Sequence, residues 1–94
     1  MRALRKQPGK PWEAIEVANE LEALQHEVGG YIETVTLGTD AVIICNEEGW
    51  LLGLPPSGFY TFSGTVLLVG ISGDEFTDVP EAAYEFFGVK EAEE

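Results

Sequence analysis

The sequence predicts an α+β fold in which two helices pack on a mostly antiparallel sheet of about five to six strands. Short apolar or alternating runs recur along the chain and are separated by turns rich in glycine and proline, which is typical of antiparallel strands. Helix-capping signals bracket two stretches, about 20–28 and 79–87. The element order is then β-β-α-β-β-β-β-α, and we expect both helices on one face of the sheet.

The first two strands and the first helix follow from local signals. Arg2–Lys6 predicts a short edge strand, and residues 12–17 predict a second strand because two glutamates interrupt an otherwise apolar run. Asn19 is a favourable N-cap, and Glu22 three residues later completes a capping-box pattern. The glycine pair at 29–30 supplies the left-handed residue that ends the helix.

A hairpin is expected in the middle of the chain. Residues 31–37 are β-branched and alternating, which predicts a strand, and residues 41–45 predict a short apolar strand at the centre of the sheet. Residues 50–54 return as its partner. The four residues between them indicate a hairpin loop. Asn46 suits the first turn position, where its side chain accepts from the backbone two residues on, and Gly49 supplies a positive φ.

The C-terminal third predicts one further strand and the second helix. Residues 59–62 fit either a loop or the edge of a strand. Residues 65–71 are apolar throughout and flanked by glycine-containing turns, which predicts a strand. Asp78 and Glu81 again have capping-box spacing, and Pro80 suits the first helical turn, where a missing N–H is harmless.

Size and composition favour one soluble domain over residues 1–94. A chain of 94 residues with 45% hydrophobic content can bury a core, and one cysteine cannot form an internal disulfide. No apolar run approaches the roughly 18 residues that span a bilayer. The basic N-terminus is not followed by an apolar signal core. We therefore expect a cytoplasmic protein with an acidic C-terminal tail at 91–94.

Charge is the most unusual property of the chain. There are 17 acidic residues and five basic ones, and the net charge is −12. No lysine or arginine occurs from Pro11 to Val89. Such a charge disfavours contact with nucleic acid or anionic lipid, so we expect no direct binding to nucleic acid or membranes. A basic protein is the class of partner that the charge favours.

The acidic turn at 46–48 predicts neither a metal site nor a catalytic centre. A calcium loop needs further oxygen ligands at alternate positions, and apolar residues follow instead. Cys45 and His26 have no partner at zinc-ligand spacing. We expect Cys45 to be a buried, inert thiol and His26 to lie on a solvated helix face. The sequence thus predicts no metal, no cofactor, no catalytic residue and no enzymatic activity.

Five segments of the chain carry a likeness to a known family. They are PGKPWEAIEV, ELEALQHEVGGYIETV, ICNEEGWLLGLPP, GTVLLVG and DEFTDVPEA. Together they resemble a family of small proteins of unknown function found in bacteria, phages and other mobile elements, and the VGGYIE and ICNEEG blocks are fairly specific. The resemblance implies a setting in mobile DNA and no particular reaction.

Two functions are compatible with these features. The first is a protein-interaction domain, which in a mobile element would inhibit a basic host nuclease or defence protein by mimicking nucleic acid; alternatively, the acidity only keeps the protein soluble. The second is a small-ligand or enzymatic domain with a pocket near Tyr31, Asn46 and Tyr60. The aromatic residues at 84, 86 and 87 cannot all point inward from a short helix, so one is an interface candidate. The residues expected to contact a partner are Glu20, Glu27, Glu33, Glu47, Glu48, Asp74, Glu75, Phe86 and Phe87.

Overall fold

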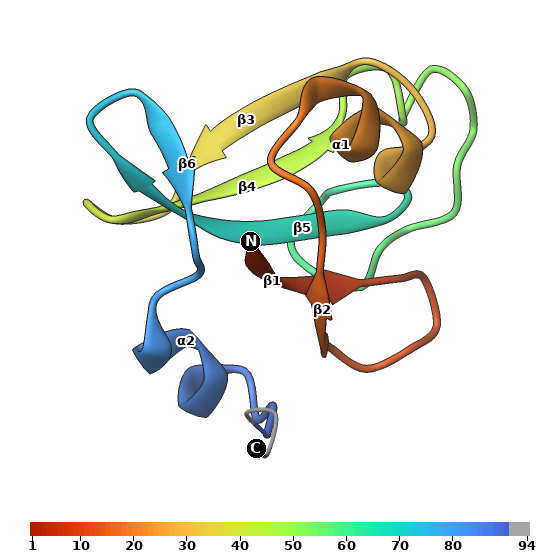
Figure 1. Cartoon of the computed structure of the whole chain (residues 1–94). Coiled ribbons are helices and arrows are strands. Elements are labelled where there is room, and N and C mark those ends of the chain that lie inside the picture. Colours follow the sequence, from red (N-terminus) through yellow and green to blue (C-terminus); the bar gives the residue numbers. More distant parts are fainter. Residues whose placement is uncertain (91–94) are drawn as a thin grey trace.

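A computed structural model describes residues 1–90, which form a six-stranded sheet and two helices (Figure 1). The strands are β1 (Arg2–Lys6), β2 (Glu13–Glu16), β3 (Ile32–Thr36), β4 (Ala41–Asn46), β5 (Val66–Ser72) and β6 (Glu75–Thr77). The helices are α1 (Leu21–Val28) and α2 (Glu81–Phe86). The acidic tail expected at 91–94 lies outside the described residues. Within residues 1–90, neither helix is long and apolar enough to cross a membrane.

Neighbouring strands of the sheet are antiparallel throughout, in the order β2-β1-β5-β4-β3. β5 lies in the middle of this order. Its first half pairs with β1, with Leu68 opposite Leu4, and its end pairs with the short strand β6, with Ile71 opposite Phe76. β2 and β3 form the two outer edges. The prediction that Arg2–Lys6 is an edge strand is therefore wrong, because β1 pairs with β2 on one side and with β5 on the other. The predicted α+β class with a mostly antiparallel sheet is confirmed.

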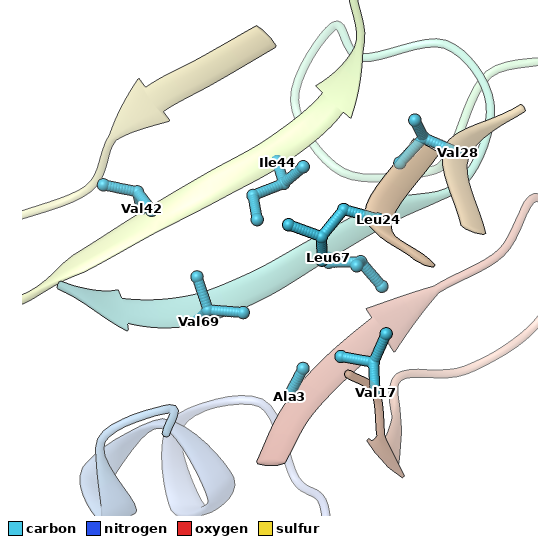
Figure 2. Packing of buried hydrophobic residues seen from close by; sticks show 8 residues of the cluster. All are labelled: Ala3, Val17, Leu24, Val28, Val42, Ile44, Leu67 and Val69. Carbon is cyan, nitrogen blue, oxygen red and sulfur yellow. The ribbon is translucent and has the colours of Figure 1, made fainter. Parts of the chain in front are cut away.

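One face of the sheet packs against α1. The side chains that meet there come from alternate strand positions, because successive side chains of a strand point to opposite faces. Leu24 and Val28 of α1 cluster with Ile44 of β4 and Leu67 of β5, and Figure 2 shows this cluster from close by. Leu24 and Val28 lie one helical turn apart, which gives the short helix its buried stripe.

The opposite face is covered by α2 and by the long connection between β4 and β5. Ile43 and Leu68 pack there with Tyr84 of α2 and with half-buried aromatic residues such as Phe62. The expectation that both helices share one face is therefore wrong, and Figure 1 shows α1 and α2 on opposite sides of the sheet. The reason is that β4 and β5 are apolar on both faces, so each face needs a covering layer.

Residues 50–54 do not form a strand, which corrects the predicted hairpin. β4 already pairs with β3 on one side and with β5 on the other, so no place beside it is free. The chain curls instead, with hydrogen bonds from Leu52 N–H to Glu48 O at 2.8 Å and from Leu54 N–H to Gly49 O at 3.0 Å. The predicted positive φ at Gly49 is also wrong, since Gly49 lies outside the left-handed region.

The helices end as predicted but begin differently. Gly29 adopts a φ of +81° after α1, and Gly88 adopts +69° just beyond α2. Asn19 does not cap α1. Its side-chain amide donates to Phe76 O at 2.9 Å, and Glu20 takes the cap position without a side-chain bond. The predicted capping box is therefore replaced by a link between the start of α1 and β6.

β6 was not predicted from the sequence. It forms a hairpin with the end of β5 through the two-residue loop 73–74, in which Gly73 adopts a φ of +64°. Asp78, expected to cap α2, instead accepts a hydrogen bond from Arg2 N–H at 2.8 Å, and Pro80 takes the cap position. Both predicted capping side chains therefore bond to a distant strand rather than to their own helix.

Candidate interaction surface

Asn46, the last residue of β4, holds the turn that follows it against the end of α1. Its side-chain amide donates to Val28 O at 3.1 Å, and its Oδ1 accepts from Glu48 N–H at 2.7 Å. The second bond is the one predicted from the sequence. Gly30 permits this close approach, because a Cβ there would lie 2.8 Å from Asn46 Nδ2. Since the buried amide is bonded at both ends, the turn has a fixed position.

The turn presents two carboxylates and three large apolar side chains to solvent. Glu47 and Glu48 are exposed. Trp50, Leu51 and Leu52 are 82%, 73% and 58% exposed, respectively. Large apolar side chains rarely gather on a surface without a binding role. We call residues 46–52 the acidic loop.

Gly49 secures the acidic loop from behind. It is buried, and a Cβ at this position would lie 2.7 Å from Ser63 O, on the returning part of the connection. Glycine is therefore required here by the close approach of two backbones and not by its own backbone conformation.

Two pockets flank the acidic loop. The larger, of about 610 Å³, lies between the loop and the C-terminal end of α1, and its lining includes Glu22, His26, Tyr31, Asn46, Glu48 and Leu52. The smaller, of about 150 Å³, is lined in part by Glu33, Val35, Glu47 and Trp50. Both pockets beside the loop are thus lined by carboxylates together with apolar groups.

The arginines of the chain are neutralised elsewhere. Arg5 forms ion pairs with Glu13 and Glu27, both at 2.9 Å. The hydrogen bonds that its guanidinium donates, first to Glu13 and then to Glu27, raise the pKa of that guanidinium. Arg2 lies 3.5 Å from Asp78. The other acidic residues within 1–90 form no ion pair. The carboxylates of the acidic loop are therefore not neutralised by an ion pair, and their negative charge acts on the surrounding solvent.

The predicted partner contacts do not form one surface. Glu47 and Glu48 belong to the acidic loop, and Glu33 lines the smaller pocket beside it. Glu20 is exposed at the start of α1, and Asp74 and Glu75 are exposed in the β5–β6 hairpin. Glu27 was expected to be exposed, but it is half-buried and held by Arg5. The structure thus brings three of the predicted acidic contacts together and distributes the rest.

The predicted aromatic contacts lie on a second surface, at α2. Phe86 is 81% exposed and Tyr84 is buried. Phe87 is half-buried against Trp12, with ring centroids 4.6 Å apart. Phe86 and Tyr60 border an apolar pocket of about 390 Å³ between α2 and the long connection. The expectation that one of the aromatic residues at 84, 86 and 87 is exposed is confirmed, and that residue is Phe86.

The pocket expected near Tyr31, Asn46 and Tyr60 is not a single site. Tyr31 and Asn46 line the larger pocket at the acidic loop, whereas Tyr60 lines the apolar pocket at α2. Tyr60 has a φ of +50° and stacks on Phe59 with ring centroids 4.4 Å apart. These three side chains are therefore not placed to contact one small ligand.

Cys45 and His26 lie in the surroundings expected of them. Cys45 is buried at the end of β4. Burial is the main cause that raises the pKa of its thiol to about 11, and the nearby carboxylate of Glu33 adds to it. The reactive thiolate is therefore scarce at neutral pH. His26 is exposed on α1. Among residues 1–90, no three Asp, Glu, His or Cys side chains are grouped as a metal site would require.

The exposed apolar side chains of the acidic loop were not predicted. The run from Trp50 was assigned to a strand because its composition is apolar. The signal against a strand was Gly53, which interrupts the run after three residues and adopts a φ of +73°. A run of three large apolar residues between an acidic turn and a glycine indicates a surface loop as readily as a strand.

Comparison with known proteins places the chain in a family. A family described as a domain of unknown function, DUF3846, matches residues 1–89, which is nearly the whole chain. No curated protein and no solved structure matches it. The resemblance to a family of unknown function is thereby confirmed. The chain belongs to the DUF3846 family, a domain of unknown function.

Proposed function

We propose that this protein is a non-enzymatic interaction domain that binds a basic protein partner at the acidic loop. One observation carries the proposal: the exposed carboxylates of Glu47 and Glu48 lie on the same fixed turn as the exposed ring of Trp50. Binding interfaces typically combine an aromatic anchor with a surrounding polar rim. Trp50 serves as the anchor and the two carboxylates belong to the rim.

The charge distribution supports a basic partner. The net charge is −12, and the arginines are engaged by Glu13, Glu27 and Asp78, none of which belongs to the acidic loop. Opposite charge on a partner accelerates encounter and selects against acidic competitors. Nucleic acid and anionic membranes are repelled by the same field.

In the setting of phages and mobile elements that the resemblance implies, the partner is a cytoplasmic host nuclease or defence protein. Such proteins hold nucleic acid in basic grooves, mainly through contacts to phosphates. The carboxylates of Glu47, Glu48 and Glu33 take the place of phosphates in that groove. Trp50 adds an apolar contact that a phosphate backbone lacks, which lets the domain compete with nucleic acid.

The test is the binding kinetics of a partner captured from host lysate. Glu47→Lys/Glu48→Lys reverses the charge of the acidic loop, and Glu81→Lys/Glu85→Lys makes the same change in charge on α2, which is the matched control. We expect the loop variant to lower the association rate by about tenfold or more and the α2 variant to lower it far less. Wild-type affinity should fall steeply with salt, because exposed charges are screened beyond about 8–10 Å.

The apolar part of the surface is tested separately through dissociation. Trp50→Ala should raise the dissociation rate and leave the association rate nearly unchanged, as expected for an anchor. Phe86→Ala removes an equally exposed ring at α2 and shows whether the second surface takes part. A partner that is indifferent both to salt and to charge reversal at the acidic loop contradicts the proposal.

A small-ligand domain is the second candidate, and the larger pocket favours it. Its volume of about 610 Å³ lies within the range of ligand sites. Glu22, Glu48 and the C-terminal end of α1 give the pocket a negative potential, which suits a small cation. A rise in melting temperature with a polyamine, lost in Glu22→Gln/Glu48→Gln, would favour this function over the first.

A further inference from the structure

The free edge of β3 borders the acidic loop and has no strand beside it in the described chain (Figure 1). We propose that this edge receives an extended, basic segment of the partner, which adds to the sheet as a further strand. This inference rests on the proposed function and specifies how the partner is held. Addition of a strand to an open edge is a common way of binding peptides, because the backbone bonds supply affinity and alternate side chains supply specificity.

The register of β3 identifies the backbone groups that point outward. Glu47 N–H donates to Tyr31 O at 2.8 Å, and Leu37 N–H donates to Ala41 O at 2.9 Å. In an antiparallel pair, hydrogen-bonded residues alternate with residues whose backbone groups face away. The odd-numbered residues of β3 therefore bond to β4. The N–H and C=O groups of Ile32, Thr34 and Thr36 face the open edge.

Apart from Glu33, the edge lacks the usual protection against pairing. Natural edge strands are shielded by lysine, proline, bulges or a covering segment. β3 contains four β-branched residues and one charge, Glu33, and its residues 33–36 are all exposed. Val35 shares the smaller pocket with Trp50, so an added strand finds an apolar contact next to the edge. β-branched residues also favour the extended conformation that such pairing requires.

Charge selects the occupant. Glu33 points to the same side of the sheet as Cys45, Glu47 borders the same pocket, and Asp40 is exposed beyond the far end of β3. A segment with lysine or arginine at alternate positions would face Glu33 and Glu47 near the start of β3 and Asp40 beyond its end. A second copy of this chain would bring one charge of −12 against another, which disfavours pairing of two β3 edges.

The test uses short synthetic peptides and amide hydrogen exchange measured by NMR. The probe is a peptide in which lysine and valine alternate, and its matched control has glutamate in place of lysine. We expect the lysine peptide, at saturation, to slow exchange at Ile32, Thr34 and Thr36 by about tenfold or more, since these amides gain partners. Glu33 and Val35 already bond to β4 and should change little. The glutamate peptide should have no effect.

Proline substitutions provide the variants. Thr34→Pro removes an outward N–H without breaking a bond to β4, and proline is tolerated on edge strands. We expect it to weaken binding of the lysine peptide by at least about tenfold, because both the bond and the space beside the edge are lost. Ala14→Pro is the matched control on the opposite edge. Met1 N donates to Val17 O and Val17 N–H donates to Met1 O, so the odd-numbered residues of β2 bond to β1. The N–H of the even-numbered Ala14 therefore faces outward, as that of Thr34 does.

If Thr34→Pro does not fold, a second variant still tests the binding of the peptide at the β3 edge. Glu33→Lys keeps the backbone of β3 and reverses the charge that faces the peptide lysines, so the lysine peptide should bind at least about tenfold more weakly and the glutamate peptide more tightly. Loss of binding in Thr34→Pro, with Ala14→Pro unaffected, supports strand addition. Loss of binding in Glu33→Lys supports it when the wild type also shows protection of the Ile32, Thr34 and Thr36 amides.

The outcomes separate this inference from the proposed function. Salt-sensitive binding of the lysine peptide that leaves Ile32, Thr34 and Thr36 unprotected overturns strand addition and leaves an acidic binding surface in place. A dimer that protects the same three amides without any peptide overturns the choice of occupant. If the lysine peptide does not bind even at low salt, both the strand addition and the charge-driven partner are contradicted.

Discussion

Two apolar runs lie a few residues apart in this chain, and one is buried whereas the other is exposed. All six residues of β4 are buried, and both of its neighbours in the sheet are strands. The run that begins at Trp50 has similar hydrophobicity, yet its three large side chains are exposed on the acidic loop. The difference lies in the partners available. β5, which follows much later in the sequence, takes the place beside β4 that the second run would need.

The comparison shows that the hydrophobic content of a run predicts that the run needs to be buried. It does not predict which strand, helix or partner protein will bury it. β4 meets that requirement within the fold. The acidic loop does not, since hydrogen bonds from Leu52 to Glu48 and from Leu54 to Gly49 curl it into an exposed turn. An exposed apolar group that the fold leaves uncovered is a candidate for burial by a partner. The predictions below test whether the two runs differ as described.

The largest expected difference is between core and loop truncations. Ile44→Ala removes a fully buried side chain from β4 and should lower the free energy of unfolding by about 2–5 kcal/mol. Trp50→Ala should change it by no more than about 0.5 kcal/mol, because the ring is exposed. Urea denaturation of both variants measures this contrast. Equal losses would mean that Trp50 is buried and that the loop is wrongly described.

Asn46 should show the next largest effect, since it joins the two runs. Asn46→Ala leaves the Val28 carbonyl and the Glu48 N–H without their partners, and we expect a loss of about 1–3 kcal/mol of unfolding free energy. Asn19→Ala is the control, because Asn19 also makes one bond from its side chain to a distant backbone carbonyl but lies exposed. It should cost less than about 1 kcal/mol. A reversed order would argue against a fixed acidic loop.

Gly49 and Gly53 should be required for different reasons, the first by crowding and the second by backbone conformation. Gly49→Asn places a Cβ against Ser63 O and should cost about 1–3 kcal/mol, as overpacking does. Gly53 has a φ of +73° and open space around it, and asparagine tolerates that conformation. Gly53→Asn should therefore cost less than about 1 kcal/mol. Thermal melts of the two variants distinguish crowding from backbone conformation as the reason for each glycine.

The last expected effect on stability comes from Cys45, and it appears only at alkaline pH. Burial raises the pKa of the thiol to about 11, above its value of about 9 in the unfolded chain, so the folded state disfavours the thiolate. The contribution of Cys45 is complete below pH 9 and is lost as the pH rises toward 11. Unfolding free energies of the wild type and Cys45→Ala should converge over that range. At pH 8 the folded protein should react with a thiol reagent far more slowly than the unfolded chain.

Local patterns predicted much of the sheet. β4 and β5 were identified because an apolar run bounded by turn residues needs no knowledge of the partner strand. Gly29 was identified as the end of α1 because a left-handed residue is a local requirement. Long-range pairing decided the rest. The place beside β4, the bonds of Asn19 and Asp78 to distant strands, and the two-sided burial of the sheet depend on residues far away in the sequence.

The candidate site was predicted in part for the same reason. The acidic turn and the bond from Glu48 N–H to Asn46 were expected from turn chemistry. The grouping of Glu33 with Glu47 follows from the pairing of β3 with β4, which joins residues that are distant in the sequence. The exposure of Trp50 followed from the failure of its run to find a partner strand, for which Gly53 is the local signal.

Amide hydrogen exchange of the free protein tests the contrast between the two runs most directly. The described fold predicts that the amides of β4 exchange only through global unfolding, since strands flank it on both sides. The amides of Trp50 and Leu51 should exchange orders of magnitude faster, through local opening of the loop. Protection of residues 50–54 equal to that of β4 would place them in a central hairpin and would contradict an exposed, partner-binding acidic loop.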